Sequence, residues 1–167
     1  SLPDANDPLG PLVRSRMSNL IIRTIPRFSS TLGTTFDGFE KLPFVDRTMQ
    51  FRATARNNQG GTAWDDMTLN VAGEPFRITY PTNALNRTCG APQDITWVGG
   101  GGAVAPNVSI WYSGDNGGDF TELVASTPNN GLKAVNLPKK PVNDKARVMV
   151  EAVGNIFFSV SNDNFSI

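Results

Sequence analysis

Residues 95–120 have the sequence ITWVGGGGAVAPNVSIWYSGDNGGDF, in which two apolar segments lie on either side of four glycines. The segments 95–98 and 107–113 are rich in β-branched and aromatic residues, as the central strands of packed sheets are. No helix pattern follows the glycines, so we interpret them as a flexible connection rather than a phosphate-binding loop. We expect Trp97 and Trp111 to lie in or beside the core. The stretch therefore predicts two packed β-sheets.

The same pattern continues on both sides of this stretch and predicts an all-β fold. Short segments that suit strands are separated by Gly, Pro, Asn and Asp, and we expect strands at 76–80, 94–98, 107–113, 119–124, 131–137, 145–153, 156–160 and 163–167. Their number and spacing are typical of an immunoglobulin-like β-sandwich. We therefore predict a complete sandwich module over residues 74–167.

The preceding part of the chain predicts one β-hairpin. From Arg47, apolar residues alternate with polar ones as far as Arg56, and the alternation returns over residues 64–71. Between them, Asn57-Asn58-Gln59-Gly60-Gly61 supplies residues that tolerate a positive φ. Residues 72–75 (AGEP) then form a hinge, which places the domain boundary near residue 73. Residues 1–73 are thus predicted to be a partial β-sandwich module with an irregular, proline-broken N-terminal segment.

The composition excludes several classes of function. Fifteen basic and fifteen acidic residues give a formal net charge of zero, which is not the basic surface that nucleic acids require. The sequence contains no histidine, so we expect neither a self-contained zinc hydrolase nor a Ser-His-Asp site. The remaining carboxylate pairs are Asp65 with Asp66, which would point to opposite faces of a strand, and Asp115 with Asp119. We predict that the chain is not itself an enzyme.

The single cysteine and the hydropathy give limited information on location. Cys89 has no partner for an internal disulfide, and we expect it to be a small buried apolar residue. No apolar run approaches the roughly 20 residues that span a bilayer. The start at Ser1-Leu2 lacks signal-peptide character and resembles a cloning remnant, so the signal of a secreted parent protein is expected upstream.

The sharpest local motif is Ser113-Gly114-Asp115-Asn116-Gly117-Gly118-Asp119-Phe120, which lies between two predicted strands. It has the Ser-x-Asp-x-Gly-x-x-aromatic pattern of an Asp-box hairpin, in which side chains bond the backbone of the turn. A second interpretation is a calcium site, because Asp115, Asn116 and Asp119 place several oxygens in one tight loop. Both interpretations stay open from the sequence.

Three stretches of the chain carry a resemblance to a known family. They are ARVMVEAVGNIFFSVSNDNFSI at 146–167, MQFRATARNN at 49–58 with DDMTL at 65–69, and IWYS at 110–113 with DNGG at 115–118. Together they resemble the non-catalytic, immunoglobulin-like region that follows the catalytic domain in bacterial secreted reprolysin-like zinc metallopeptidases.

The resemblance implies where the chemistry of such a protein lies. The zinc site of the family belongs to a domain N-terminal to this region, so no catalytic residue is carried over to this chain. The family arrangement implies that residues 1–72 are the later part of a module whose opening strands precede residue 1. The expected location is secreted or at the cell surface.

Three functions follow as hypotheses. The first is an accessory region that binds the catalytic domain of the parent protein or its protein substrate, or that serves in spacing, surface attachment or export. The second is a carbohydrate-binding module for surface glycans, which needs an exposed aromatic platform and makes Trp64 the candidate ligand-binding residue. The third is a structural or adhesin-type spacer, in which calcium would be the cofactor and no exposed aromatic is expected. A strand from a neighbouring copy could complete the first module.

Overall fold

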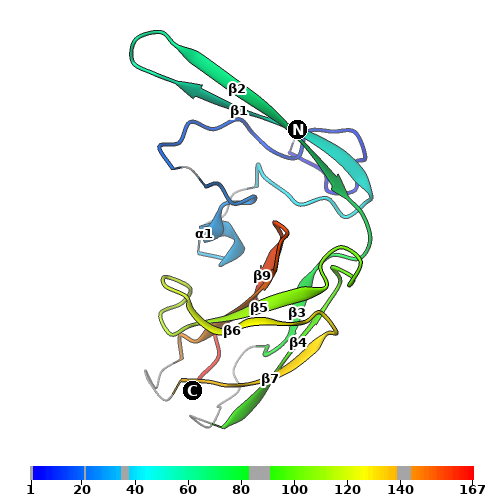
Figure 1. Ribbon diagram of the computed structural model, residues 1–167, viewed down its shortest axis with the longest axis vertical. Coiled ribbons are helices and arrows are strands. Elements are labelled where there is room, and N and C mark those ends of the chain that lie inside the picture. The colour runs from blue at the N-terminus through cyan, green and yellow to red at the C-terminus, as the bar shows by residue number, and fades with distance from the viewer. Residues whose placement is uncertain (1, 21, 35–37, 83–90, 139–143) are drawn as a thin grey trace. The chain divides into compact units, whose positions relative to one another are not determined.

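The computed structural model describes residues 2–20, 22–34, 38–82, 91–138 and 144–167. In these ranges the chain has one short helix and nine strands, so the prediction of an all-β fold is confirmed (Figure 1). The elements are α1 (Phe28–Thr31), β1 (Arg47–Arg56), β2 (Thr62–Val71), β3 (Arg77–Tyr80), β4 (Pro92–Val98), β5 (Asn107–Ser113), β6 (Thr121–Pro128), β7 (Leu132–Asn136), β8 (Arg147–Ala152) and β9 (Phe158–Val160). Cys89 lies outside the described residues.

The chain forms two compact units. The first comprises Ser1–Pro26 and Asp37–Gly73, and the second comprises Arg27–Phe36 and Glu74–Ile167. The segment Arg27–Phe36, which carries α1, therefore groups with the second unit, although the sequence pattern placed it with residues 1–73. We call this segment the strap.

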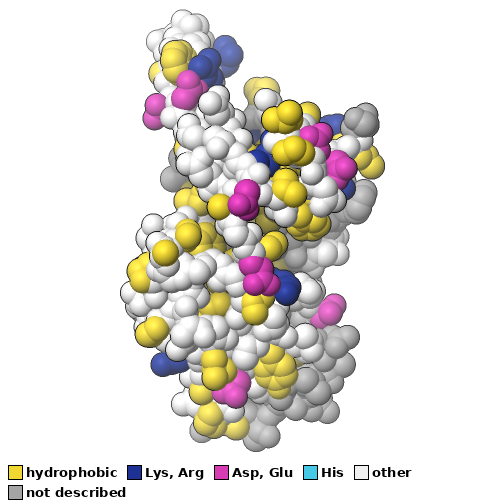
Figure 2. Space-filling model, turned by 90° about the vertical axis from the view of Figure 1, so that its right-hand side faces the viewer, with side chains coloured by type: hydrophobic (Ala, Val, Ile, Leu, Met, Phe, Trp, Pro, Cys, Tyr) yellow, Lys and Arg dark blue, Asp and Glu magenta, His cyan; other side chains and the backbone are white. Residues whose placement is uncertain are grey.

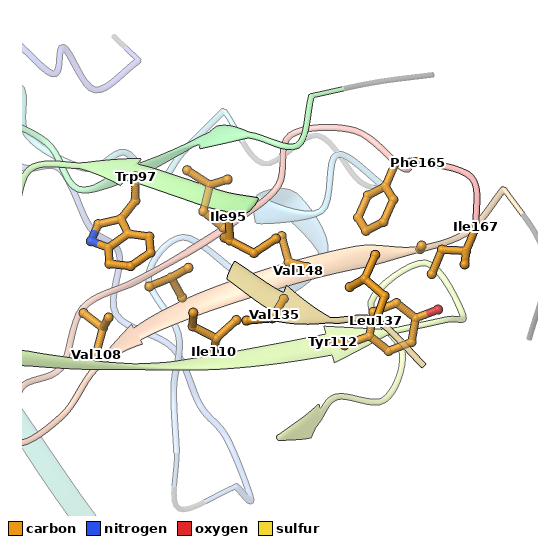
Figure 3. Packing of buried hydrophobic residues seen from close by; sticks show 13 residues of the cluster. Ile95, Trp97, Val108, Ile110, Tyr112, Val135, Leu137, Val148, Phe165 and Ile167 are labelled. Carbon is orange, nitrogen blue, oxygen red and sulfur yellow. The ribbon is translucent and has the colours of Figure 1, made fainter. Parts of the chain in front are cut away.

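The second unit is a sandwich of two antiparallel sheets. One sheet has the strand order β3-β4-β7 and the other the order β6-β5-β8-β9. Alternate residues of each sheet point inward, so Ile95 and Trp97 of β4 meet Val108 and Ile110 of β5 in one core (Figure 3). Ile95, Val108 and Ile110 are fully buried, and burying each such side chain contributes about 1.5–3 kcal/mol.

The end of the chain closes the core without forming a strand of its own. The sequence pattern predicted a strand at 163–167, but the segment has isolated bridges instead, among them one between Ala146 and Phe165. Phe165 and Ile167 still point into the core and are almost completely buried (Figure 3). The apolar residues of this segment thus indicate that it is buried, and not that it forms a strand.

The first half of the glycine run between β4 and β5 is closely packed, where a flexible connection was expected, whereas an added side chain at Gly101 or Gly102 would meet open space. A side chain at Gly99 would meet the carbonyl oxygen of Pro75 at 2.5 Å, and one at Gly100 would meet the Phe157 ring at 2.7 Å. Asn129 also holds this loop, because its Nδ2 donates hydrogen bonds to the carbonyl oxygens of Gly100 and Ala105 at 2.7 and 3.0 Å. The first two glycines are therefore required by close approach of neighbouring groups.

The first unit contains the predicted hairpin, β1 and β2, in a two-stranded sheet. Its ten cross-strand pairs run from Arg47 with Val71 to Arg56 with Thr62 without a register shift. The turn is closed by Asn57, whose Oδ1 accepts hydrogen bonds from the amides of Gln59 and Gly61. From position 52 to position 68 every residue is exposed, so only the base of the hairpin is partly buried.

The strap packs on the second unit through two apolar side chains. Phe28 lies with its ring centroid 6.0 Å from the rings of both Phe120 and Phe158. Leu32 is buried and lies against Gly117, where an added side chain would approach it to 2.6 Å. The strap is thus part of the sandwich unit although it precedes β3 by more than forty residues.

A single side chain connects the strap to the end of the chain. Arg147 of β8 is only 6% exposed and donates hydrogen bonds from Nε to Asn164 Oδ1 (2.7 Å), from NH1 to the Ser161 carbonyl (3.0 Å) and from NH2 to the Leu32 carbonyl (3.0 Å). Burial lowers the pKa of Arg147 from its ordinary value, and nearby Asp163 acts in the opposite direction. The planar guanidinium fits this role because its donors point in several fixed directions.

Replacing Arg147 with Met is expected to lower the free energy of unfolding by about 2–4 kcal/mol, because two buried carbonyl oxygens and the half-buried Asn164 side chain lose their donor. Arg147→Lys should recover only part of this loss, since an ammonium group cannot reach the three acceptors in one plane. Urea denaturation is the measurement. The control is Arg77→Met, because Arg77 is exposed and pairs with Glu74 at 3.5 Å. Equal effects at the two positions would contradict the prediction.

Candidate functional site

The Asp-box motif forms a tight turn after β5, centred on Asp115. The Ser113 hydroxyl donates to Asp115 Oδ1 at 2.6 Å, and the Gly117 amide donates to the Ser113 hydroxyl oxygen at 2.9 Å. Asp115 Oδ1 also accepts from the amides of Gly118 and Asp119, both at 3.0 Å. Asn116 takes a φ of +67°, which Asn tolerates better than most residues. The motif thus builds its own turn from local side-chain bonds.

These bonds favour the ionised form of Asp115. The Ser113 hydroxyl and then the Asp119 amide hold the pKa of the Asp115 carboxyl below its ordinary value. Because the pKa is lowered in the folded state, the stability gained is complete above the unfolded-state pKa. It is lost as the pH falls through the folded-state pKa.

The calcium interpretation of this turn stays a prediction. Of the three candidate ligands, Asp115 and Asp119 are exposed and Asn116 is half-buried. Asp115 Oδ1 already accepts three hydrogen bonds, while its Oδ2 accepts one, from the Asp119 amide at 3.1 Å. In the described part of the chain, no three His, Cys, Asp or Glu side chains gather as a metal-binding group. A cation here would draw on Oδ2, Asp119 and backbone oxygens.

Trp64 is exposed on the hairpin, as a carbohydrate platform requires. Its exposed fraction is 60%, and the Arg52 guanidinium lies 4.2 Å from the centroid of its ring. Arg52 also forms two hydrogen bonds with the Asp66 carboxylate, at 2.7 and 2.8 Å. These bonds lower the pKa of Asp66 and raise that of Arg52. The three side chains make a polar cluster with one aromatic ring on one face of the hairpin.

The predicted positions of Asp65 and Asp66 follow from the register of the hairpin. Asp66 lies opposite Arg52, and Asp65 lies opposite Ala53 on the other face. The two carboxylates therefore do not address one ligand. Trp97, in contrast to Trp64, is 2% exposed and donates from Nε1 to Asn129 Oδ1 at 2.6 Å, which confirms its expected place in the core.

The first unit contains a hollow that the sequence pattern did not indicate. It has a volume of about 410 Å³ and is lined by Asp4, Pro26, Glu40, Leu42 and Phe44, among others. The Glu40 side chain is only 1% exposed, and its Oε1 pairs with the Arg23 guanidinium, while its Oε2 has no hydrogen-bond partner among the described residues. Leu42 and Phe44 are 54% and 66% exposed. A buried acceptor thus lies beside exposed apolar side chains.

A second, smaller hollow lies in the sandwich unit. It has a volume of about 330 Å³, and Trp97, Gly99 and Asn129 are among the residues that line it. The Asn129 side chain is already bonded to Trp97 Nε1 and to two carbonyl oxygens of the glycine loop. The polar groups of this hollow therefore maintain the fold.

Comparison with known proteins adds no assignment: no family model matches the chain, and no curated protein matches it. In the described residues, no helix is both long and apolar enough to cross a membrane.

Replacing Asp115 with Ala is expected to lower the free energy of unfolding by about 1–2 kcal/mol, because two backbone amides and one hydroxyl lose their acceptor. Urea denaturation in EDTA measures this change, with Asp94→Ala, an exposed carboxylate on β4, as the control. Thermal melts of the unmodified chain in EDTA and in millimolar calcium then test the metal, since a ligand of the folded state raises the melting temperature. An unchanged melting temperature would contradict the calcium prediction.

Proposed function

We propose that this chain is a non-catalytic, protein-binding accessory region of a secreted bacterial zinc metallopeptidase. The resemblance to the region after the catalytic domain of such enzymes supports the parent protein, and it is carried by residues 49–58, 65–69, 110–113, 115–118 and 146–167. The surface of the first unit supports binding as its role. The partner is a protein: the catalytic domain of the parent enzyme or its substrate.

The observation that carries the proposal is the uneven exposure of apolar side chains. Among the described residues, fourteen large hydrophobic side chains are exposed, and ten of them belong to the first unit. These ten are Leu2, Leu9, Met17, Leu20, Ile22, Phe39, Leu42, Phe44, Trp64 and Met67. Figure 2 shows one face of the molecule, on which hydrophobic side chains reach the surface. Single exposed apolar residues are ordinary, but a concentration of them marks an interaction surface.

The hollow beside Glu40 is the part of this surface best suited to a protein partner. Leu42 and Phe44 offer apolar contact area at its edge, and aromatic side chains contribute strongly to protein interfaces. The Glu40 side chain is only 1% exposed, so a partner would contact the apolar edge of the hollow rather than this carboxylate.

The exposed aromatic side chains also distinguish this proposal from a purely structural spacer, which needs none. Phe44 is 66% exposed and Trp64 is 60% exposed. Aromatic side chains with this much exposure have little contact with their own unit, so most of their surface is available for a partner to cover.

The test is titration calorimetry of the chain against the separately purified catalytic domain of the parent enzyme. The double substitution Leu42→Ser and Phe44→Ser should weaken binding by about tenfold or more, because it removes apolar contact area. The matched control is Val104→Ser with Leu132→Ser, two exposed apolar residues of the second unit. Absence of binding, or equal weakening by both pairs, would count against the proposal.

A second candidate function, glycan binding, is favoured by Trp64 alone. One face of the ring carries the Arg52 guanidinium, and exposed polar side chains of Thr54 and Asp66 lie on the same face of the hairpin. An exposed ring beside hydrogen-bonding groups is the arrangement that sugar rings require.

Trp64→Ala is expected to abolish retardation of the chain in gels that contain a bound polysaccharide, with cellulose derivatives, xylan and glucomannan as the panel. Met67→Ala is the matched control, because Met67 is also exposed on β2 but lies on the opposite face. If the unmodified chain migrates identically in every gel, the glycan hypothesis fails for this panel.

A further inference from the structure

The outer edge of β1 has the properties of a strand that accepts another strand. Since β1 and β2 form a two-stranded sheet, each has one edge without a strand neighbour in the described part of the chain. The hairpin has no register shift, whereas the pair β3–β4 contains one and the pair β5–β6 contains two. Long, regular and open edges readily pair with a further strand unless charges or bulges oppose it.

The charges along β1 do not oppose such pairing. Arg52 is compensated within its own hairpin by Asp66. Arg47 donates from NH1 to the Asp7 carbonyl at 2.8 Å. Arg56 at the far end of β1 is exposed, and Asp46 just before the strand is exposed as well. One strand therefore presents a cation at one end and a carboxylate at the other, ten residues apart along the chain.

This arrangement is complementary to itself. If two β1 strands lie antiparallel with Phe51 of one copy opposite Phe51 of the other, Arg56 of each copy faces Asp46 of the other. In the same register Met49 faces Ala53, and Arg52 faces Gln50. Since side chains of equal parity share a face, the apolar pairs fall on one face and the polar pairs on the other.

We propose that two copies of this chain form a symmetric dimer through antiparallel β1–β1 pairing centred on Phe51. The product is a four-stranded sheet with the order β2-β1-β1-β2, closed by a two-fold axis. The two aromatic rings meet at the axis, and one ion pair forms at each end of the new ladder. The dimer does not rest on the proposed function, because it uses neither Leu42 nor Phe44.

The neighbouring registers are less favourable. Moving the centre to position 52 puts Arg52 opposite Arg52 of the other copy, and like charges directly opposite each other are destabilising. Moving it to position 50 puts Arg56 opposite Phe44, which leaves this cation without an acid. Pairing through the β2 edge brings no ion pair, because Asp65 and Asp66 are the only charged residues of that strand. The charges of β1 are thus complementary to those of a second β1, which favours a second copy of this chain as the partner over a strand of another protein.

The register can be tested by disulfide trapping. In a Cys89→Ser background, which has no other cysteine, Phe51→Cys places the two thiols opposite each other at the axis. Opposed residues have Cα atoms about 4.5–5.5 Å apart, within reach of a disulfide. The control Ala53→Cys places its two thiols roughly four residues apart along the strands, or about 13 Å, which is too far. Mild oxidation should convert most of the Phe51→Cys chain into covalent dimer. The Ala53→Cys chain should give less than about a tenth of that amount of covalent dimer.

Sedimentation velocity on chains that keep Phe51 gives an independent measurement. Arg56→Glu should weaken dimerisation by about tenfold, and adding Asp46→Lys should restore it, because the ion pair re-forms with reversed charges. Arg77→Glu makes the same change in net charge on the second unit and should leave dimerisation unchanged. A chain that stays monomeric up to about 1 mM, a concentration that populates even weak association, overturns the dimer. Equal trapping at positions 51 and 53 overturns the register and with it the proposal.

Discussion

One guanidinium, that of Arg147 in β8, donates hydrogen bonds to two segments of the second unit that lie far apart in sequence. Its partners are the Leu32 carbonyl in the strap, the Ser161 carbonyl and the Asn164 side chain. One buried charge is thus shared by β8, an inner strand of the four-stranded sheet, by the strap and by the closing segment of the chain. A buried charge is costly unless every donor is used, so these segments must be in place together. The order of the strap and the order of the C-terminal segment are therefore coupled through β8.

The strands of both units are predictable because the sequence pattern that indicates each strand is local. Alternation of side chains and turns built from Gly, Asn and Asp appear within each segment, as in β5 and in the hairpin with its Asn57 turn. The strap is not predictable in this way, since Phe28 and Leu32 form no repeating pattern and their partners, Phe158 and Arg147, follow more than a hundred residues later. Its place depends on tertiary contacts, which override local propensity in short segments.

The candidate sites differ in the same way: a site built from local bonds is predictable, and a site assembled from distant segments is not. The Asp115 turn could be predicted in outline, because the hydrogen bonds made by the Ser113 and Asp115 side chains join residues at most four positions apart. The hollow beside Glu40 could not, because it brings together residues near position 5, near position 26 and near position 42. In the glycine loop, the local pattern was misleading because four glycines suggest flexibility. The side chain of Asn129, nearly thirty residues away, donates hydrogen bonds to two carbonyl groups of this loop. Sequence patterns thus identify turns well and assembled hollows poorly.

The two units differ in how much of their apolar surface they bury themselves. The sandwich unit encloses a core that includes Ile95, Val108 and Val150, all completely buried. In the described residues of the first unit, the buried hydrophobic side chains are only Ala5 and Leu12. Burial on this scale does not offset the conformational entropy of ordering a chain segment of that length. A partner that covers the exposed apolar residues would add stability by mass action, so binding and ordering of the first unit are expected to be thermodynamically linked.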